Sequence, residues 1–150
     1  MKTVQGWLDE YGESHQNPTN KKIHWICVPL IMLSLIGLLH ELPVITDNIH
    51  WSYIFICFVC IYYIRLSIMM FIGMSIIGAL LVMGVFILED YLSYPLWKTS
   101  LIIFIVSWLG QFIGHKIEGK KPSFFQDIQF LLIGPLWLLS FVYNKIGIKY

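Results

Sequence analysis

Charged residues are scarce in this chain. Only 13% of its 150 residues are charged, Arg65 is the single arginine, and the formal net charge is +1. Nucleic-acid-binding proteins carry a basic patch or stripe, so this composition excludes that class of partner. In contrast, 57% of the residues are hydrophobic, which is more apolar surface than one small soluble core can bury. The composition therefore indicates an integral membrane protein whose solvent includes the lipid bilayer.

Cysteines are few, and all of them lie in apolar segments. An odd set of three, Cys27, Cys57 and Cys60, provides no disulfide framework. The Cys57-x-x-Cys60 pair lacks the second pair that a four-ligand zinc site needs, so we interpret it as apolar filler. The first 22 residues are polar and mixed in charge, unlike a cleaved signal peptide. The first apolar span is therefore expected to act as its own targeting signal.

Four apolar segments approach the roughly 20 residues that a helix needs to cross the hydrocarbon core. They are residues 23–39, 51–64, 66–88 and 96–113. A fifth run, 130–143, contains Gly134-Pro135, and its length suits a re-entrant or shallow helix at least as well as a full crossing. Internal repeats and low-complexity segments are absent. We therefore predict one all-α domain, a bundle of four to five transmembrane or re-entrant helices with short interfacial helices. Its parts are an interfacial segment 1–22, four spans within 23–113, a cytoplasmic loop 114–128 and the fifth helix 130–143.

Basic residues mark one side of this bundle. They precede span one, separate spans two and three, and follow span four, as Lys2, Lys21, Lys22, Arg65, Lys116, Lys120 and Lys121. The opposite loops, 40–50 and 89–94, contain no Lys or Arg. The positive-inside rule makes the basic side cytoplasmic. A bacterial inner membrane and the endoplasmic reticulum both agree with these residues, and the compact chain favours the former.

Two segments show the pattern of interfacial helices. Apolar residues recur at i, i+3, i+4 and i+7 from Val4 to Tyr11, which predicts a short amphipathic helix over residues 3–13. Ser123 and Gln126 have the spacing of a capping box, which predicts a second interfacial helix through residues 124–130.

Two histidines flank a break in the chain ahead of span one. On a continuous helix His15 and His24 would point about 180° apart and could not bind one ion. The intervening Asn17-Pro18-Thr19-Asn20 removes that problem, because Pro18 stops the first helix and Thr19 or Asn20 can cap the next. His24 would then lie in the first turn of span one, and the chain could fold back to bring both imidazoles together.

The end of span four supplies partners for these histidines. Gln111, His115 and Glu118 lie at i, i+4 and i+7, so they form one stripe of a helix whose ionisable end lies on the same cytoplasmic side. Three histidines and a carboxylate converging at one depth predict a metal site. Histidine and carboxylate without thiolate favours Fe(II), Mn or Zn, and the sequence does not choose among them.

Simpler roles compete with this interpretation. An interfacial histidine is often only amphipathic, although the coincidence of three on one face weighs against that. Glu118 has two possible roles. It is a solvated charge paired with Lys121 or Lys22, or it binds the metal directly or orients a residue that does. His40 and His50 lie on the opposite side, where we prefer a structural role. A small-residue face beside the stripe is interpreted as close helix packing; it consists of Ser107, Gly110 and Gly114.

Both histidine segments resemble motifs of a known family. The first motif is matched by Tyr11, His15, Asn20, His24 and Pro29, with Cys27 where the family has glycine. The second, Gln-x-x-Gly-His-x-x-Glu followed by Pro, is matched by Gln111, Gly114, His115, Glu118 and Pro122, with Ser123 where alanine is usual. Over nearly its whole length the chain resembles the small endoplasmic-reticulum and bacterial membrane proteins typified by the fungal 2-hydroxy fatty acid dioxygenase of phytosphingosine breakdown.

The resemblance implies a non-haem Fe(II) enzyme that uses O2 to shorten a long-chain 2-hydroxy fatty acid by one carbon, an α-oxidation step. Our hypothesis is that His15, His24 and His115 hold the iron and that the substrate's carboxylate and hydroxyl oxygens chelate it. Glu118 and Gln111 would orient the histidines, and Glu118 belongs to the expected catalytic set. Other residues expected around the metal or the anionic head group are Tyr11, Asn20, Lys116, Lys120 and Lys121.

Two other functions remain open at this stage. A metal-dependent lipid hydrolase, with bound hydroxide as nucleophile and Glu118 as general base, would work without oxygen. A non-enzymatic packing or transport protein would need a polar path through the bilayer, and spans one to three contain no Asp, Glu or Lys well inside them. A di-iron hydroxylase is disfavoured because histidines are too few and no H-x-x-H-H cluster is present. A homo-oligomer is compatible with each of these functions.

Overall fold

The computed structural model describes residues 2–45, 49–123 and 128–150, and every regular element among them is helical. The helices are α1 (Val4–Glu13), α2 (Pro18–His40), α3 (Trp51–Leu66), α4 (Ile68–Tyr91), α5 (Leu96–Glu118) and α6 (Phe130–Ile146). The predicted all-α membrane fold is confirmed. The interfacial helix predicted from Ser123 and Gln126 falls mostly on residues 124–127, outside the described residues.

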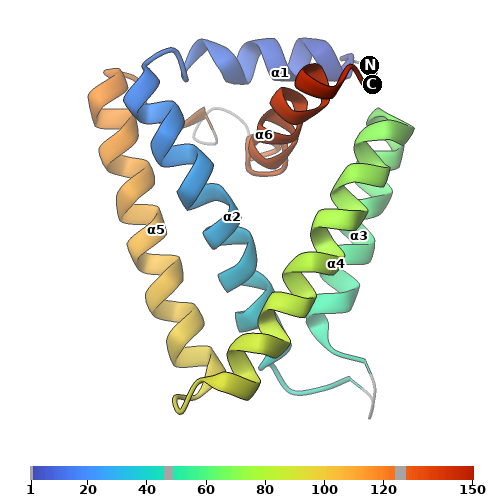
Figure 1. Cartoon of the computed structure of the whole chain (residues 1–150), viewed down its shortest axis with the longest axis vertical. Coiled ribbons are helices and arrows are strands. Elements are labelled where there is room, and N and C mark those ends of the chain that lie inside the picture. The colour runs from blue at the N-terminus through green and yellow to red at the C-terminus, as the bar shows by residue number, and fades with distance from the viewer. Residues whose placement is uncertain (1, 46–48, 124–127) are drawn as a thin grey trace.

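The long helices form a V (Figure 1). One arm consists of α2 and α5, the other of α3 and α4, and the arms meet where α2 ends and α5 begins. Among the described helices, α2, α4 and α5 are long and apolar enough to cross a membrane, whereas α3 has 16 residues and runs beside α4. Only three of the four predicted spans therefore reach membrane-crossing length.

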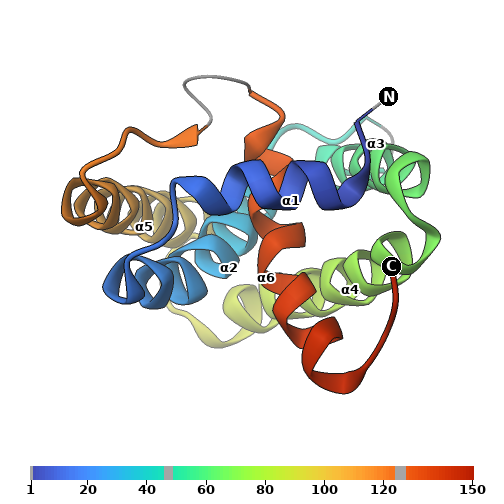
Figure 2. The same ribbon diagram turned by 90° about the horizontal axis from the view of Figure 1, so that it is seen from above.

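The wide end of the V is covered by two helices. α1 lies across it, and α6 passes beneath α1 between the arms (Figures 1 and 2). Ten residues of α6 are buried although the helix contains Pro135. Because α6 does not extend toward the narrow end, its arrangement favours the shallow alternative over a full crossing.

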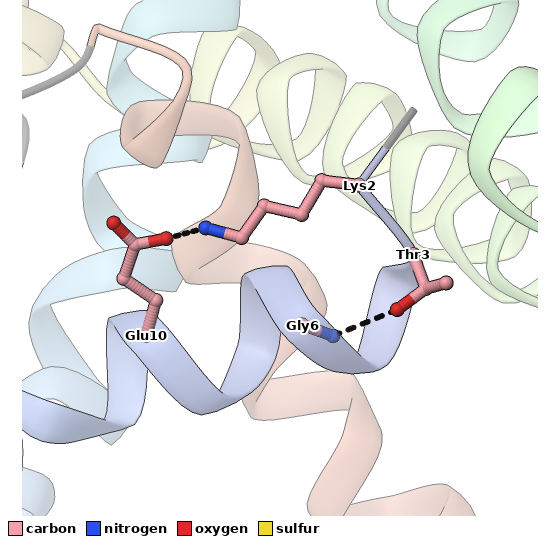
Figure 3. A network of polar contacts seen from close by, with 4 residues as sticks. All are labelled: Lys2, Thr3, Gly6 and Glu10. Carbon is pink, nitrogen blue, oxygen red and sulfur yellow. Dashed lines mark hydrogen bonds and ion pairs between the residues drawn. The ribbon is translucent and has the colours of Figure 1, made fainter.

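α1 is an amphipathic helix, as its sequence predicts. The Gly6 N–H donates to the side chain of Thr3, which caps the helix, and Lys2 forms an ion pair with Glu10 above the next turns (Figure 3). The opposite face of α1 packs mainly against α6 and buries Val4, Leu8 and Tyr11. This packing fixes where the chain leaves α1 and approaches α2.

α2 begins earlier than its sequence suggests. Asn17 caps it by accepting a hydrogen bond from the Thr19 N–H at 2.9 Å, and Pro18 occupies the first turn, where its missing N–H is no loss. The expectation that Thr19 or Asn20 caps this helix is therefore wrong. His24 consequently lies in the second turn of α2 instead of the first.

α5 ends later than predicted. Residues 114–118, assigned to a loop from the sequence, complete the last turns of the helix, which stops at Gly119 in a left-handed conformation with a φ of 74°. The left-handed conformation favours glycine, because glycine has no Cβ to clash with the backbone. The continuation places Gln111, His115 and Glu118 on one helical stripe.

α2 and α5 approach closely through small residues. A Cβ at Gly110 would lie 2.6 Å from the Cys27 sulfur, and one at Gly114 would collide with the Asn20 side chain. Ser107 on the same face is 2% exposed. The packing role interpreted for Gly110 and Gly114 is confirmed, and Cys27 fills the space over Gly110.

Gly110→Ala is expected to lower the free energy of unfolding by about 1–3 kcal/mol, because the added methyl overpacks the contact with Cys27. Thermal unfolding of the detergent-solubilised protein measures this change. The double substitution Cys27→Gly with Gly110→Ala should recover part of the loss, whereas Leu109→Ala, which alters a side chain that is 57% exposed, is the matched control. Equal effects of Gly110→Ala and the control would contradict the close contact.

Candidate metal centre

Three buried histidines meet at the top of the α2–α5 arm. His15 lies in the loop after α1, His24 in α2 and His115 in α5, and they are 0%, 1% and 5% exposed. Their ring centroids lie 4.3, 4.8 and 5.0 Å apart, with each pair of rings close to perpendicular. One ligand nitrogen from each lies within 4.8 Å of the others. The structure thus brings together the three histidines named from the sequence.

Hydrogen bonds fix the tautomer of two of these rings. The His15 Nδ1–H donates to the Tyr11 carbonyl at 2.6 Å, and the His24 Nδ1–H donates to the Asn20 carbonyl at 3.0 Å. Each ring therefore directs an Nε2 lone pair inward, and the two Nε2 atoms are 2.9 Å apart. Burial, followed by the nearby His24, lowers the pKa of His15 to about 3, so this ring is neutral at neutral pH. Two facing lone pairs repel unless a cation lies between them.

The donor set fits a divalent metal. Histidine ligands commonly donate their second ring nitrogen to a carbonyl, as His15 and His24 do. The Nδ1 of His115 is buried and has no hydrogen-bond partner within the described part of the chain, and such an orphaned polar atom is of the kind that a bound ion or water satisfies. Neutral imidazoles without thiolate suit iron, zinc or manganese.

Glu118 holds the loop that carries His15. Its carboxylate accepts hydrogen bonds from the Gln16 N–H at 2.7 Å, the Asn17 N–H at 2.8 Å and the Asn20 Nδ2 at 3.0 Å. The carboxylate therefore also lies at the N-terminus of α2, where the helix dipole favours negative charge. None of these bonds ends on a histidine, so in the described residues Glu118 reaches His24 only through Asn20, whose carbonyl accepts from that ring.

Aromatic residues enclose His15. The Tyr11 ring stacks on it with centroids 4.1 Å apart, and the Trp137 ring of α6 lies 5.2 Å away. Burial raises the pKa of Tyr11, so its phenol keeps its proton. Sequence patterns do not reveal Trp137, because it lies far along the chain in an otherwise uniform apolar run.

A pocket opens beside the histidines. Its polar wall includes Tyr11, His24, Gln111 and His115, and the remaining lining is mostly apolar, from Val28, Ile31, Met32, Trp108, Phe130, Leu131, Gly134 and Pro135, together with Ser123. Ser123, which the sequence predicts as a helix cap, shares a hydrogen bond with Ser14 across the chain.

The three expected head-group lysines do not line this pocket. Lys116 and Lys121 are exposed, and Lys120 donates to the Glu13 carbonyl at 2.7 Å, where it ties the end of α1 to the segment after α5. Attraction of the anionic head group by these lysines therefore stays a prediction, and it would act over a longer distance than direct contact.

The other two histidines lie at the narrow end of the V. His40 and His50 stack with centroids 3.9 Å apart, and the His50 Nδ1–H donates to the His40 carbonyl at 2.9 Å. These contacts join the end of α2 to the start of α3, which agrees with the structural role expected for both residues.

Comparison with known proteins agrees with the resemblance noted in the sequence. Over 149 residues the chain is 28% identical to a protein of Saccharomyces cerevisiae named 2-hydroxy-palmitic acid dioxygenase MPO1, and the match covers 96% of this chain and 82% of that protein. No solved structure matches the present chain. Residues 1–146, which include all three clustered histidines, match the family described as 2-hydroxy-palmitic acid dioxygenase Mpo1-like. The chain therefore belongs to the Mpo1-like family.

Proposed function

We propose that this protein is an Fe(II)-dependent dioxygenase that uses O2 to shorten long-chain 2-hydroxy fatty acids by one carbon at the membrane interface. The observation that carries the proposal is the buried cluster of His15, His24 and His115, with two Nε2 atoms directed at one another. The name of the Saccharomyces relative supports the reaction class and the substrate class.

The pocket supports a substrate with a polar head and an apolar tail. Its polar residues gather beside the histidines, and its apolar residues come from α2 and α6, with Trp108 from α5. A 2-hydroxy acid would place its carboxylate and hydroxyl toward the histidines, with the tail on the apolar side. When bound, Fe(II) would supply the activation of O2 that cleavage of the bond between C1 and C2 requires.

The chain's own residues would prepare this site. Tyr11 keeps a protonated phenol on the pocket wall, so it can donate a hydrogen bond to the anionic head group. Glu118 and Asn20 would hold the backbone on either side of the break between His15 and His24. Burial under α1 and α6 would exclude water from the reacting carbons.

The sidedness of the site is also a proposal. The basic residues named from the sequence lie at the wide end of the V, which is also the end that holds the histidines, whereas Lys98 lies at the start of α5 at the other end. This asymmetry supports a cytoplasmic location for the site.

Metal analysis and oxygen dependence test the proposed function together. The detergent-purified protein, loaded anaerobically with Fe(II), is expected to bind about one iron per chain and to convert 2-hydroxypalmitic acid to the acid one carbon shorter only after O2 is admitted. Mass spectrometry of the product and elemental analysis of the protein measure both. Treatment with a chelator should abolish turnover, and Fe(II) should restore it.

Two outcomes would contradict this proposal. Bound zinc with oxygen-independent cleavage of a lipid ester would indicate the metal-dependent hydrolase considered from the sequence. Absence of any bound metal after loading would leave the histidines as structural residues of the interface.

A further inference from the structure

A second hollow adjoins the histidine pocket and carries almost no polar surface. It lies between α2, α4 and α6. Its walls are Trp25, Val28, Pro29, Met32, Met74, Ile77, Leu81, Pro135, Leu138, Leu139 and Val142. No side chain in this lining is charged, so the hollow suits a hydrocarbon ligand.

This apolar groove, defined by those lining residues, adjoins the histidine pocket and shares part of its wall. Val28, Met32 and Pro135 line both spaces. On α2, His24, Val28 and Met32 follow at intervals of four residues, so they form one stripe that leads away from the metal-binding rings. At 1.5 Å per residue, this stripe covers about 12 Å along the helix.

The groove has a defined far end. Leu81 lines it and also packs against the apolar cluster of Ile36, Val85 and Leu96, which fills the narrow end of the V. At its side, Trp25 and Val142 are 44% and 42% exposed, so the groove borders the surface that faces lipid. A ligand could therefore enter from the bilayer, extend along α2 and stop at Leu81.

We propose that the apolar groove binds the acyl tail of the substrate and that Leu81 limits the longest chain accepted. This proposal rests on the proposed function, which places the carboxylate of a 2-hydroxy acid beside His24 and His115. The acyl tail is the occupant that two adjoining spaces, one with polar groups and one apolar, favour, because it is covalently attached to the head group held at the polar end. A block to the acyl tail at Leu81 would make the length of the groove a measure of the chain length accepted.

Filling the far end tests this assignment. Leu81→Trp is expected to shift the ratio of kcat/KM for 2-hydroxylauric acid over 2-hydroxystearic acid by about tenfold toward the shorter acid, since a filled hydrophobic pocket rejects added methylenes by this order. Leu80→Trp is the matched control, because Leu80 is the adjacent residue of α4 and is 55% exposed on its outer face. An unchanged ratio in an active Leu81→Trp enzyme would overturn the proposal.

Photolabelling separates failure of the groove from failure of the proposed function. Wild-type protein is irradiated with 2-hydroxypalmitic acid that carries a diazirine at the tail end, and cross-linked peptides are mapped by mass spectrometry. Labelling at Met74, Ile77 or Leu81 that excess 2-hydroxystearic acid removes supports the groove, even if wild-type protein turns over no acid and the dioxygenase proposal fails. Labelling confined to the lipid-facing residues Ile76 and Leu80, or labelling that the competitor leaves unchanged, overturns the groove assignment.

Discussion

His24→Ala is expected to remove the bound metal and to lower turnover of a 2-hydroxy fatty acid by more than about 100-fold. Loss of a residue that merely orients a ligand already costs 10–100-fold in affinity or activity, so loss of a ligand should exceed that range. His24 contributes one of the two Nε2 atoms that lie 2.9 Å apart, and alanine offers no donor in its place. Elemental analysis after Fe(II) loading and O2-dependent product formation measure the two effects.

The matched control for this substitution is His50→Ala. His50 lies at the narrow end of the V, where it joins α2 to α3, and a loop contact there should not alter metal content. His15→Ala and His115→Ala should reproduce the effect of His24→Ala, while thermal unfolding confirms that each variant is folded. Any of the three that kept full iron content and full turnover would remove that histidine from the proposed ligand set.

Local patterns in the sequence predict the helices and the identity of the clustered histidines. The spacing from Val4 to Tyr11 predicts α1, and the spacing of Gln111, His115 and Glu118 predicts a stripe that α5 does present. Such patterns depend only on the helical repeat. They are therefore visible even in a largely apolar chain, at the places where polar residues occur.

The sequence does not predict contacts between distant segments. Glu118 accepts a hydrogen bond from the Gln16 N–H, 102 positions away in the sequence. Because the donor is a backbone group, no pattern of side chains predicts this contact. The sequence does not predict the start of α2, for a related reason: Asn17, Thr19 and Asn20 all suit a helix cap, and only the folded loop decides among them. The apolar groove likewise depends on how α6 and α4 are placed against α2, which hydropathy does not determine.

Glu118→Gln is expected to reduce iron affinity and kcat/KM by about 10–100-fold without unfolding the protein. The carboxylate accepts two backbone N–H bonds, from Gln16 and Asn17, as well as one from Asn20. An amide keeps one acceptor oxygen and presents an NH2 group to the remaining donors, so the loop with His15 should lose its fixed position. Iron titration monitored by competition with a chelator, together with steady-state kinetics, measures both losses.

Glu89→Gln is the control for Glu118→Gln. Glu89 is exposed at the end of α4, so this substitution removes the same charge far from the histidines. If Glu118→Gln abolishes turnover while iron affinity stays at the wild-type value, the carboxylate acts on the substrate or on a proton, as in the hydrolase hypothesis. If neither quantity changes, the loop is held by its other contacts, such as the stacking of Tyr11 on His15 and the hydrogen bond from His15 to the Tyr11 carbonyl. Parallel loss of affinity and activity is the result expected if Glu118 works by fixing the backbone on which His15 depends.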